Sequence, residues 1–213
     1  MEIGDYIEKA ENDLRASLEE FFTSVYPSGQ LVSHGLEHHR RVWEYAKELL
    51  RNVYALKPGT DPNFVNKLII ACYLHDIGMS VEKGERHGRH SRKICDNFLA
   101  KNSPGSSFYE DMLHAIEHHD DKDYKGSKTE NEILSILTAA DDLDAFGPDG
   151  AERYLEIYRL RGIPEDELKD RIIANARNRF RNFELSFSGF PGLISEHKKR
   201  YESLISYLSV FTP

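Results

Sequence analysis

The stretch of residues 61–78, DPNFVNKLIIACYLHDIG, combines a helix start with an unusual polar pair near its end. Asp61 followed by Pro62 is typical of a helix N-terminus, because aspartate caps free backbone N–H groups and proline fits the first turn. Apolar residues recur at helical spacing, at Phe64, Leu68 and Cys72. His75-Asp76 extends that apolar face, and Gly78 is expected to stop the helix. The stretch therefore predicts a helix that carries a histidine and an aspartate toward the core.

Helical spacing of apolar residues continues along the rest of the chain, without useful strand alternation or a visible repeat. Capping-box spacing at Ser107–Glu110 and Thr129–Glu132 is expected to open two helices, and Phe146–Gly150 to separate two others. The expected helices cover about residues 3–25, 36–56, 61–76, 88–101, 108–119, 130–145, 151–161, 164–184 and 192–210. We therefore expect an all-α fold and, with no low-complexity linker in 213 residues, a single domain over residues 1–213.

The composition argues against several classes of protein. Hydrophobic residues make up 39% and charged residues 30%, and the longest apolar run, residues 68–74, is far shorter than the roughly 20 residues of a membrane span. The N-terminus is acidic and lacks the apolar block of a signal peptide, which predicts a cytoplasmic protein. The net charge of −8 argues against dedicated nucleic-acid binding. Cys72 and Cys95 form no CxxC pair.

Histidine is concentrated in one part of the chain: nine of the ten lie between His34 and His119. On the expected helices, several polar residues share inward faces with apolar neighbours, namely His38, His75, Asp76, Asp141 and Asp144. A buried carboxylate is costly unless it is paired or bound to a metal, so these groups predict a shared divalent cation whose affinity falls at low pH. The competing interpretation makes each of them a hydrogen-bonded core group or a helix cap.

The ordered set of motifs resembles the HD superfamily of metal-dependent phosphohydrolases. It consists of SHGLEHHRRV at residues 33–42, LHDIG at 74–78 and ADDLDA at 140–145. The resemblance covers about residues 30–150 and implies an HD-type helical bundle, which helices in residues 151–213 are expected to complete. It also implies a divalent ion (Mn, Fe, Co, Ni, Zn or Mg) held by His38, His75, Asp76 and Asp141.

The resemblance further implies hydrolysis of a phosphate ester of a small molecule, of which a nucleotide is one example. Asp76 is then expected to orient the attacking water as well as to bind metal. Asp144 or Glu82 is a candidate base, and Arg41 a candidate partner for phosphate charge. Membrane binding is not expected, and the oligomeric state stays open.

The remaining histidines leave alternatives open. We expect substrate contacts from His34, His87, His90, His118 and His119, around a single ion. In the alternative, some of these histidines hold a second ion, as in phosphodiesterases or a di-iron oxygenase of the same superfamily. A non-catalytic, ligand-binding regulatory module is a third hypothesis. Three arginines near the C-terminus are expected on a solvated face, at Arg177, Arg179 and Arg181.

Overall fold

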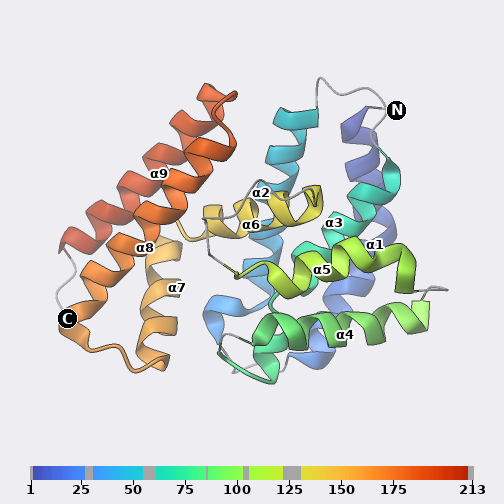
Figure 1. Ribbon diagram of the computed structural model, residues 1–213, viewed down its shortest axis with the longest axis horizontal. Coiled ribbons are helices and arrows are strands. Elements are labelled where there is room, and N and C mark those ends of the chain that lie inside the picture. Colours follow the sequence, from blue (N-terminus) through green and yellow to red (C-terminus); the bar gives the residue numbers. More distant parts are fainter. Residues whose placement is uncertain are drawn as a thin grey trace. The chain divides into compact units, whose positions relative to one another are not determined.

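The computed structural model describes residues 2–26, 31–54, 61–84, 86–102, 106–121 and 131–210. Every regular element in these ranges is an α-helix or a short 3-10 helix, which confirms the expected all-α fold (Figure 1). By its internal contacts the chain divides into two compact units. The first comprises Met1–Gln30 and His34–Ala140, and the second Leu31–Ser33 and Asp141–Pro213. A single domain over the whole chain stays a prediction.

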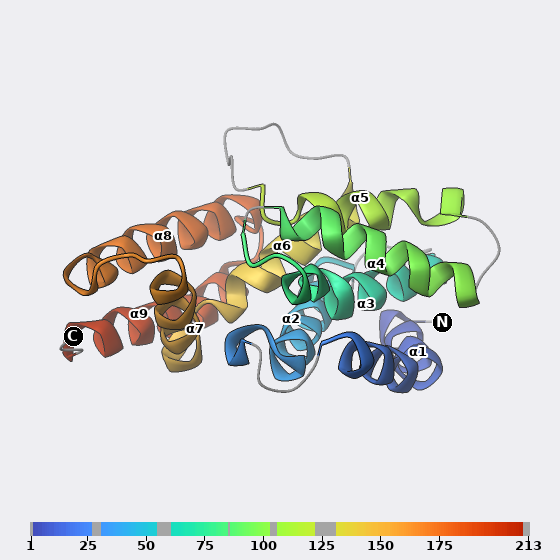
Figure 2. The same ribbon diagram turned by 90° about the horizontal axis from the view of Figure 1, so that it is seen from below.

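The first unit is a helical bundle around α3. Its helices are α1 (Ile3–Val25), α2 (Leu36–Tyr54), α3 (Pro62–Leu74), α4 (His87–Asn102), α5 (Glu110–His118) and the part of α6 (Glu132–Asp144) that ends at Ala140. Helix α3 packs against α1, α2 and α5, and its residues 68–74 are all buried. Helices α4 and α5 lie side by side, as Figures 1 and 2 both show. The apolar run of the sequence is therefore the centre of this unit.

Different interactions determine where α3 begins and how the chain continues after it. The Asp61 side chain accepts a hydrogen bond from the backbone N–H of Asn63 at 2.9 Å, which confirms the predicted N-cap. At the other end Gly78 does not stop α3 through a left-handed conformation, because its φ is not positive and it lies in the 3-10 helix Ile77–Ser80 (η2). A Cβ there would lie 2.1 Å from the backbone oxygen of His87. Glycine is needed because α4 begins against this turn.

Two expected caps are wrong or lie outside the described residues. Residues 106–109 form a 3-10 helix (η3), and α5 begins at Glu110 without a side-chain cap, so Ser107 does not open it. Thr129 lies outside the described residues. The Asn131 side chain instead accepts a hydrogen bond from the N–H of Leu134 at 3.1 Å, near the start of α6. In the described part of the chain, no helix is long and apolar enough to cross a membrane.

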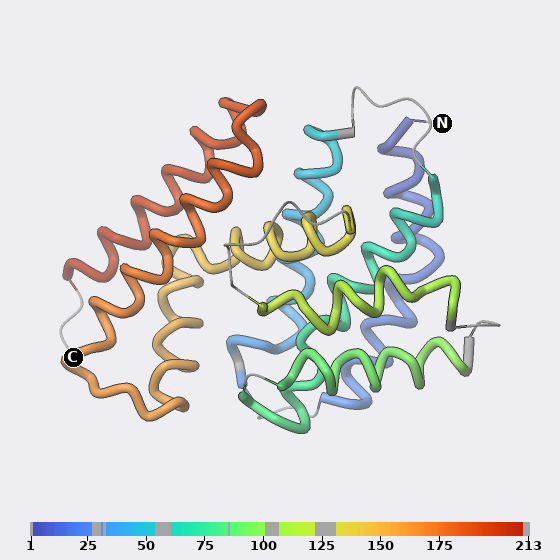
Figure 3. The backbone as a smooth tube through the Cα atoms, viewed as in Figure 1, coloured from blue at the N-terminus to red at the C-terminus, as the bar shows by residue number. Residues whose placement is uncertain are grey.

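The second unit consists mainly of α7 (Gly147–Leu160), α8 (Glu165–Ser186) and α9 (Pro191–Val210). Helices α8 and α9 pack side by side as a hairpin (Figure 3). The rings of Phe180 and Tyr201 stack between them at 4.8 Å. The expected separator at residues 146–150 is wrong in part, because α7 already begins at Gly147. Gly147 has a φ of 85°, and Pro148 fits the first turn.

Candidate metal centre

The centre of the first unit contains a buried carboxylate, that of Asp76, in the turn after α3. Its residue is 4% exposed, and the preceding His75 is fully buried. Because α3 is enclosed by other helices, the residues at its end enter the core rather than solvent. Burial on its own raises the pKa of Asp76, but the charge of His75 and hydrogen bonds from other histidines hold that pKa well below its usual range.

One oxygen of Asp76, Oδ2, faces a first group of histidines. It lies 3.4 Å from Nε2 of His38, 3.4 Å from Nε2 of His75 and 3.5 Å from Nε2 of His34. The Nε2 atoms of His38 and His75 are 3.3 Å apart. His38 belongs to α2, whereas His34 precedes that helix. Imidazole nitrogens from separate segments therefore converge on one carboxylate oxygen.

The other oxygen, Oδ1, faces a second group. It lies 2.9 Å from Nε2 of His119 and 3.1 Å from Nε2 of His87, and these two nitrogens are 3.3 Å apart. His87 is the first residue of α4, and His119 directly follows α5. The close packing of α4 on α5 brings the two rings together. Asp76 therefore has one oxygen for each group of histidines.

Three of these histidines are oriented in the same way, with Nδ1 against the backbone carbonyl oxygen three residues earlier. The bonds run from His75 to Cys72 (3.0 Å), from His87 to Gly84 (2.7 Å) and from His119 to Ile116 (2.8 Å). A carbonyl only accepts hydrogen bonds, so Nδ1 carries the proton in each neutral ring. Nε2 then presents a lone pair. Metal-binding histidines characteristically have such a partner on the other nitrogen.

The donor set fits a cation. In their neutral forms His87 and His119 direct two Nε2 lone pairs at each other over 3.3 Å, next to the anionic Oδ1 of Asp76. These groups repel one another unless a proton or a cation lies among them. Burial alone would lower the pKa of His87, but its hydrogen bond to Asp76 and the charge of that carboxylate raise the pKa to about 9. The same nitrogens can thus hold a proton or accept a divalent ion.

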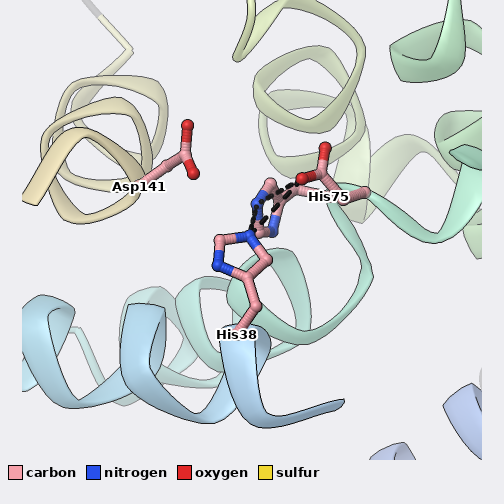
Figure 4. Close-up of side chains that lie close together, drawn as sticks. His38, His75 and Asp141 are labelled. Carbon is pink, nitrogen blue, oxygen red and sulfur yellow. Dashed lines mark hydrogen bonds and ion pairs between the residues drawn. The ribbon is translucent and has the colours of Figure 1, made fainter. Parts of the chain in front are cut away.

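Among the described residues, two sets of buried side chains place potential ligand atoms within 4.8 Å of one another. They are His38, His75, Asp76 and Asp141, and Asp76, His87 and His119. Figure 4 shows His38, His75 and Asp141 of the first set. Asp141 directly follows Ala140 in α6, a single continuous helix. The first set contains the four residues expected as ligands. The second contains two histidines expected only as substrate contacts.

His39, the neighbour of His38, belongs to neither set. Its Nδ1 lies 3.1 Å from the carbonyl oxygen of Cys72, and its ring packs on Phe22 with centroids 4.5 Å apart. Complete burial keeps the pKa of His39 well below its ordinary value. His39 is therefore a neutral core residue.

Three other residues that the sequence predicted for the site, His90, His118 and Arg41, have different surroundings. Nε2 of His90 lies 3.2 Å from Oε2 of Glu82, and both side chains are half-buried. His118 is exposed and pairs through Nδ1 with Asp121 at 2.5 Å. Arg41 is half-buried on α2. None of these belongs to either set of potential ligands among the described residues, and their roles toward a substrate stay predictions.

Two arginines of the second unit were not anticipated at a site. Arg179 pairs with Asp142 at 2.6 Å and its side chain is only 13% exposed, so its expected place on a solvated face is wrong. It lies three residues after Ala176 and four before Phe183, both buried, and this spacing could have indicated an inward side chain. Arg153 pairs with Asp144, the candidate base, at 2.9 Å.

The comparisons with known proteins identify the family. The model of the HD domain matches residues 35–146, more than half of the chain, and the chain therefore belongs to the HD domain family. HD domains bind divalent metal ions and are in general metal-dependent hydrolases. No curated protein matches the chain. Its fold is similar to a crystal structure from Lactobacillus plantarum, a Northeast Structural Genomics target, with a TM-score of 0.59 and 16% identity over 91% of this chain and 92% of that one.

Proposed function

We propose that the protein is a divalent-metal-dependent phosphohydrolase that cleaves a phosphate ester of a small molecule. The observation that carries the proposal is the buried Asp76 carboxylate, which has histidine nitrogens against each oxygen. Bound there, a divalent ion supplies a water of lowered pKa and polarises a phosphoryl oxygen. Membership of the HD domain family supports this class of chemistry.

The protein's own residues would prepare this chemistry in two ways. The carbonyl partners of His75, His87 and His119 hold each Nδ1–H away from the centre, so that only Nε2 faces Asp76. Burial keeps competing water away and makes the electrostatic interactions stronger than in solvent. With Asp141 as the fourth ligand, the first set offers two imidazoles and two carboxylates. That set suits a borderline divalent ion.

The second set supports a centre of two ions, rather than the single ion expected from the sequence: Asp76, His87 and His119 would hold the second ion. A single ion was expected because a second ion would require the helices predicted at 88–101 and 108–119 both to approach the site closely. In the structure α4 and α5 pack together, and His87 and His119 reach Oδ1 of Asp76 at 3.1 and 2.9 Å. Asp76 would thus contribute to both sites, with one oxygen facing each group of histidines.

The same two-ion arrangement favours a second candidate function, a di-iron oxygenase. A di-iron oxygenase requires redox-active iron, whereas phosphate-ester hydrolysis proceeds with several divalent metals. The two candidates therefore differ in the metal that they require and in the second substrate, dioxygen or water.

The test begins with protein purified without chelator, whose metal content is measured by elemental analysis. Stripped protein is then reloaded with Mn²⁺, Zn²⁺ or Fe²⁺ and screened for phosphate release from nucleoside monophosphates and other small phosphate esters. A phosphodiester screen and an oxygen electrode run in parallel. Metal-dependent hydrolysis that Asp76→Asn abolishes supports the proposal. Oxygen consumption with two irons per chain and no hydrolysis would favour the oxygenase. Stoichiometric metal without turnover would favour a regulatory module.

A further inference from the structure

The second unit begins with three buried carboxylates near the end of α6, those of Asp141, Asp142 and Asp144. They are 6%, 1% and 1% exposed. Buried anions are costly unless they are paired, and two arginines from the helices that follow provide partners. Both arginines lie outside the residues that match the HD domain.

Arg179, on α8, contacts two of these carboxylates with one nitrogen. Its Nη1 lies 2.6 Å from Oδ1 of Asp142 and 3.5 Å from Oδ2 of Asp141. Its Nε donates to Oδ1 of Asn175 at 2.9 Å, and that oxygen also accepts from the Tyr154 hydroxyl at 2.9 Å. The guanidinium of Arg179 is therefore held at Nε by Asn175 and at Nη1 by Asp142, and these contacts fix its position beside Asp141.

Arg153, on α7, approaches the same carboxylate from the other oxygen. Its Nη1 lies 2.9 Å from Oδ2 of Asp144, and its Nη2 lies 3.5 Å from Oδ1 of Asp141. Its Nε donates to the carbonyl oxygen of Ser33 at 2.9 Å, and the N–H of Ser33 donates to Oε2 of Glu156 at 2.7 Å. Arg153 thus connects α6 to the residue directly before His34.

The contacts form a consistent pattern of short and long distances. Each arginine makes its short pair with a neighbour of Asp141 and reaches Asp141 itself at 3.5 Å, one on each carboxylate oxygen. Pairing for stability alone needs only the short contacts to Asp142 and Asp144. The longer contacts lie on both oxygens of Asp141 and so constrain the orientation of that carboxylate.

We propose that Arg153 and Arg179 are positioning residues that hold the Asp141 carboxylate in the orientation for metal binding. The inference rests on the proposed function, in which Asp141 is a ligand. It assigns α7 and α8 a role in the centre, although no family motif extends into them.

The test compares Arg153→Lys and Arg179→Lys with the unchanged protein. Lysine keeps the positive charge but loses the planar fork that spans two carboxylates, so charge effects on the metal are held constant. The readout is the affinity of chelator-stripped protein for Mn²⁺ alone, measured by titration calorimetry. Each variant should bind about tenfold more weakly or worse, the scale typical of lost outer partners of ligands. The controls Arg159→Lys on α7 and Arg171→Lys on α8 change exposed pairs with glutamates and should bind Mn²⁺ normally.

Double variants with Asp141→Asn separate positioning from a general structural effect. If the arginines act through Asp141, adding either lysine substitution to Asp141→Asn causes no further loss of affinity. Additive losses, or single lysine variants that bind within about twofold of the unchanged protein, overturn the positioning role. If Asp141→Asn itself binds normally, the proposed ligand set is wrong as well, and the two failures are thereby distinguished. Should Arg179→Lys not fold, Asn175→Ala removes the acceptor of Arg179 Nε and replaces it in the comparison.

Discussion

Oδ1 of Asp76 lies 2.9 Å from Nε2 of His119, while Oδ2 of the same carboxylate lies 3.4 Å from Nε2 of His38. The two histidines come from segments 81 residues apart in the chain. They reach the two oxygens from different helices, because α3 packs against both α2 and α5, and the turn after it (η2) packs against α4. Asp76 is thus the one residue common to both sets of potential ligands in the described part of the chain.

Replacement of Asp76 should therefore affect the whole centre. Asp76→Asn keeps the size of the side chain but removes the negative charge that both sets share. We expect metal content to fall to a small fraction and hydrolysis to fall at least about 100-fold, because losing a direct ligand exceeds the usual cost of losing an outer partner. Elemental analysis and phosphate release measure the two effects. The control is Asp111→Asn, an exposed aspartate paired with Lys67. Full turnover with full metal in Asp76→Asn would contradict the role of this residue.

The metal content of a His119 variant distinguishes a centre of one ion from a centre of two. If His119 and His87 hold a second ion with Asp76, His119→Ala should lower the metal content from two per chain toward one. If His119 only contacts substrate, the metal content stays near one while KM rises or kcat falls. We expect the first result, because Nε2 of His119 is 2.9 Å from Oδ1 of Asp76.

The adjacent His118 provides the matched control for that measurement. It is exposed, pairs with Asp121 and belongs to neither set of potential ligands. His118→Ala should therefore leave the metal content unchanged. Loss of an equivalent in both variants would point to a shift of the segment after α5 rather than to a lost ligand.

Sequence patterns predicted the helices of this protein better than the contacts between them. The apolar stripe gave α1 its observed limits, residues 3–25, and the Asp61 cap follows from local chemistry alone. Whether His87 and His119 meet depends on the packing of α4 on α5, which no spacing within either helix encodes.

Three local sequence patterns led to wrong structural predictions. Ser107 has capping-box spacing, yet its residues form a 3-10 helix before α5 begins. Gly78 was interpreted as a helix stop, whereas its lack of a side chain allows the close approach of α4. Arg179 was assigned to a solvated face together with Arg177 and Arg181, although its spacing from Ala176 and Phe183 places it on the buried face.

Metal affinity should rise with pH through the titration of His87. In the metal-free protein Asp76 raises the pKa of His87 to about 9, above its ordinary value of 6.5, so a proton competes with the ion. Affinity for Mn²⁺ should increase by up to about tenfold per pH unit up to about pH 9, because binding must displace that proton.

The free energy of unfolding of the metal-free protein should change in the opposite direction with pH, because the protonated His87–Asp76 pair stabilises the fold. That stabilisation is complete below pH 6.5 and is lost as the pH rises through 9.

Titrations in two buffers of different ionisation enthalpy measure the proton released on Mn²⁺ binding. The same titrations on His87→Gln provide the control, since glutamine has no proton to lose. Proton release that is identical in both proteins would assign the pH dependence to another group.

Glu19 should make the stability of the first unit depend on acid pH. It accepts hydrogen bonds from Arg40, Arg15 and Tyr73, which connects α1, α2 and α3. The hydrogen bond from Arg40 is the main reason that the pKa of Glu19 falls from 4.5 to about 2. The stabilisation is therefore present above pH 4.5 and is lost as the pH falls through 2. Because the side chain is 20% exposed, we expect Glu19→Gln to lower the free energy of unfolding by about 2 kcal/mol at neutral pH.

Urea unfolding at pH 7 and pH 2.5 measures this contribution. The difference between Glu19→Gln and the unchanged protein should shrink at the lower pH, where Glu19 becomes partly protonated. Asp13→Asn, which removes an exposed pair with Lys9 on the same helix, should change stability little at either pH. A Glu19→Gln effect of equal size at both pH values would mean that packing, and not charge, stabilises this junction.

Gly88 controls the distance between α4 and α5, and hence the pair His87–His119. A Cβ at Gly88 would lie 2.3 Å from the backbone oxygen of Glu117 and 3.3 Å from that of Ile116, the carbonyl that orients His119. Since backbone atoms cannot rotate away as a side chain can, Gly88→Ala must move the helices apart, at a cost of about 1–3 kcal/mol. The second set of ligands should be disturbed while His38 and His75, held by α2 and α3, keep their places. The variant should therefore lose one of two metal equivalents and retain the other, as measured by elemental analysis of the folded protein.

Gly4→Ala is the control, because nothing lies within 4 Å of the added methyl group in α1. Retention of both equivalents in a folded Gly88→Ala protein would show that the approach of α4 to α5 does not set the second ion site.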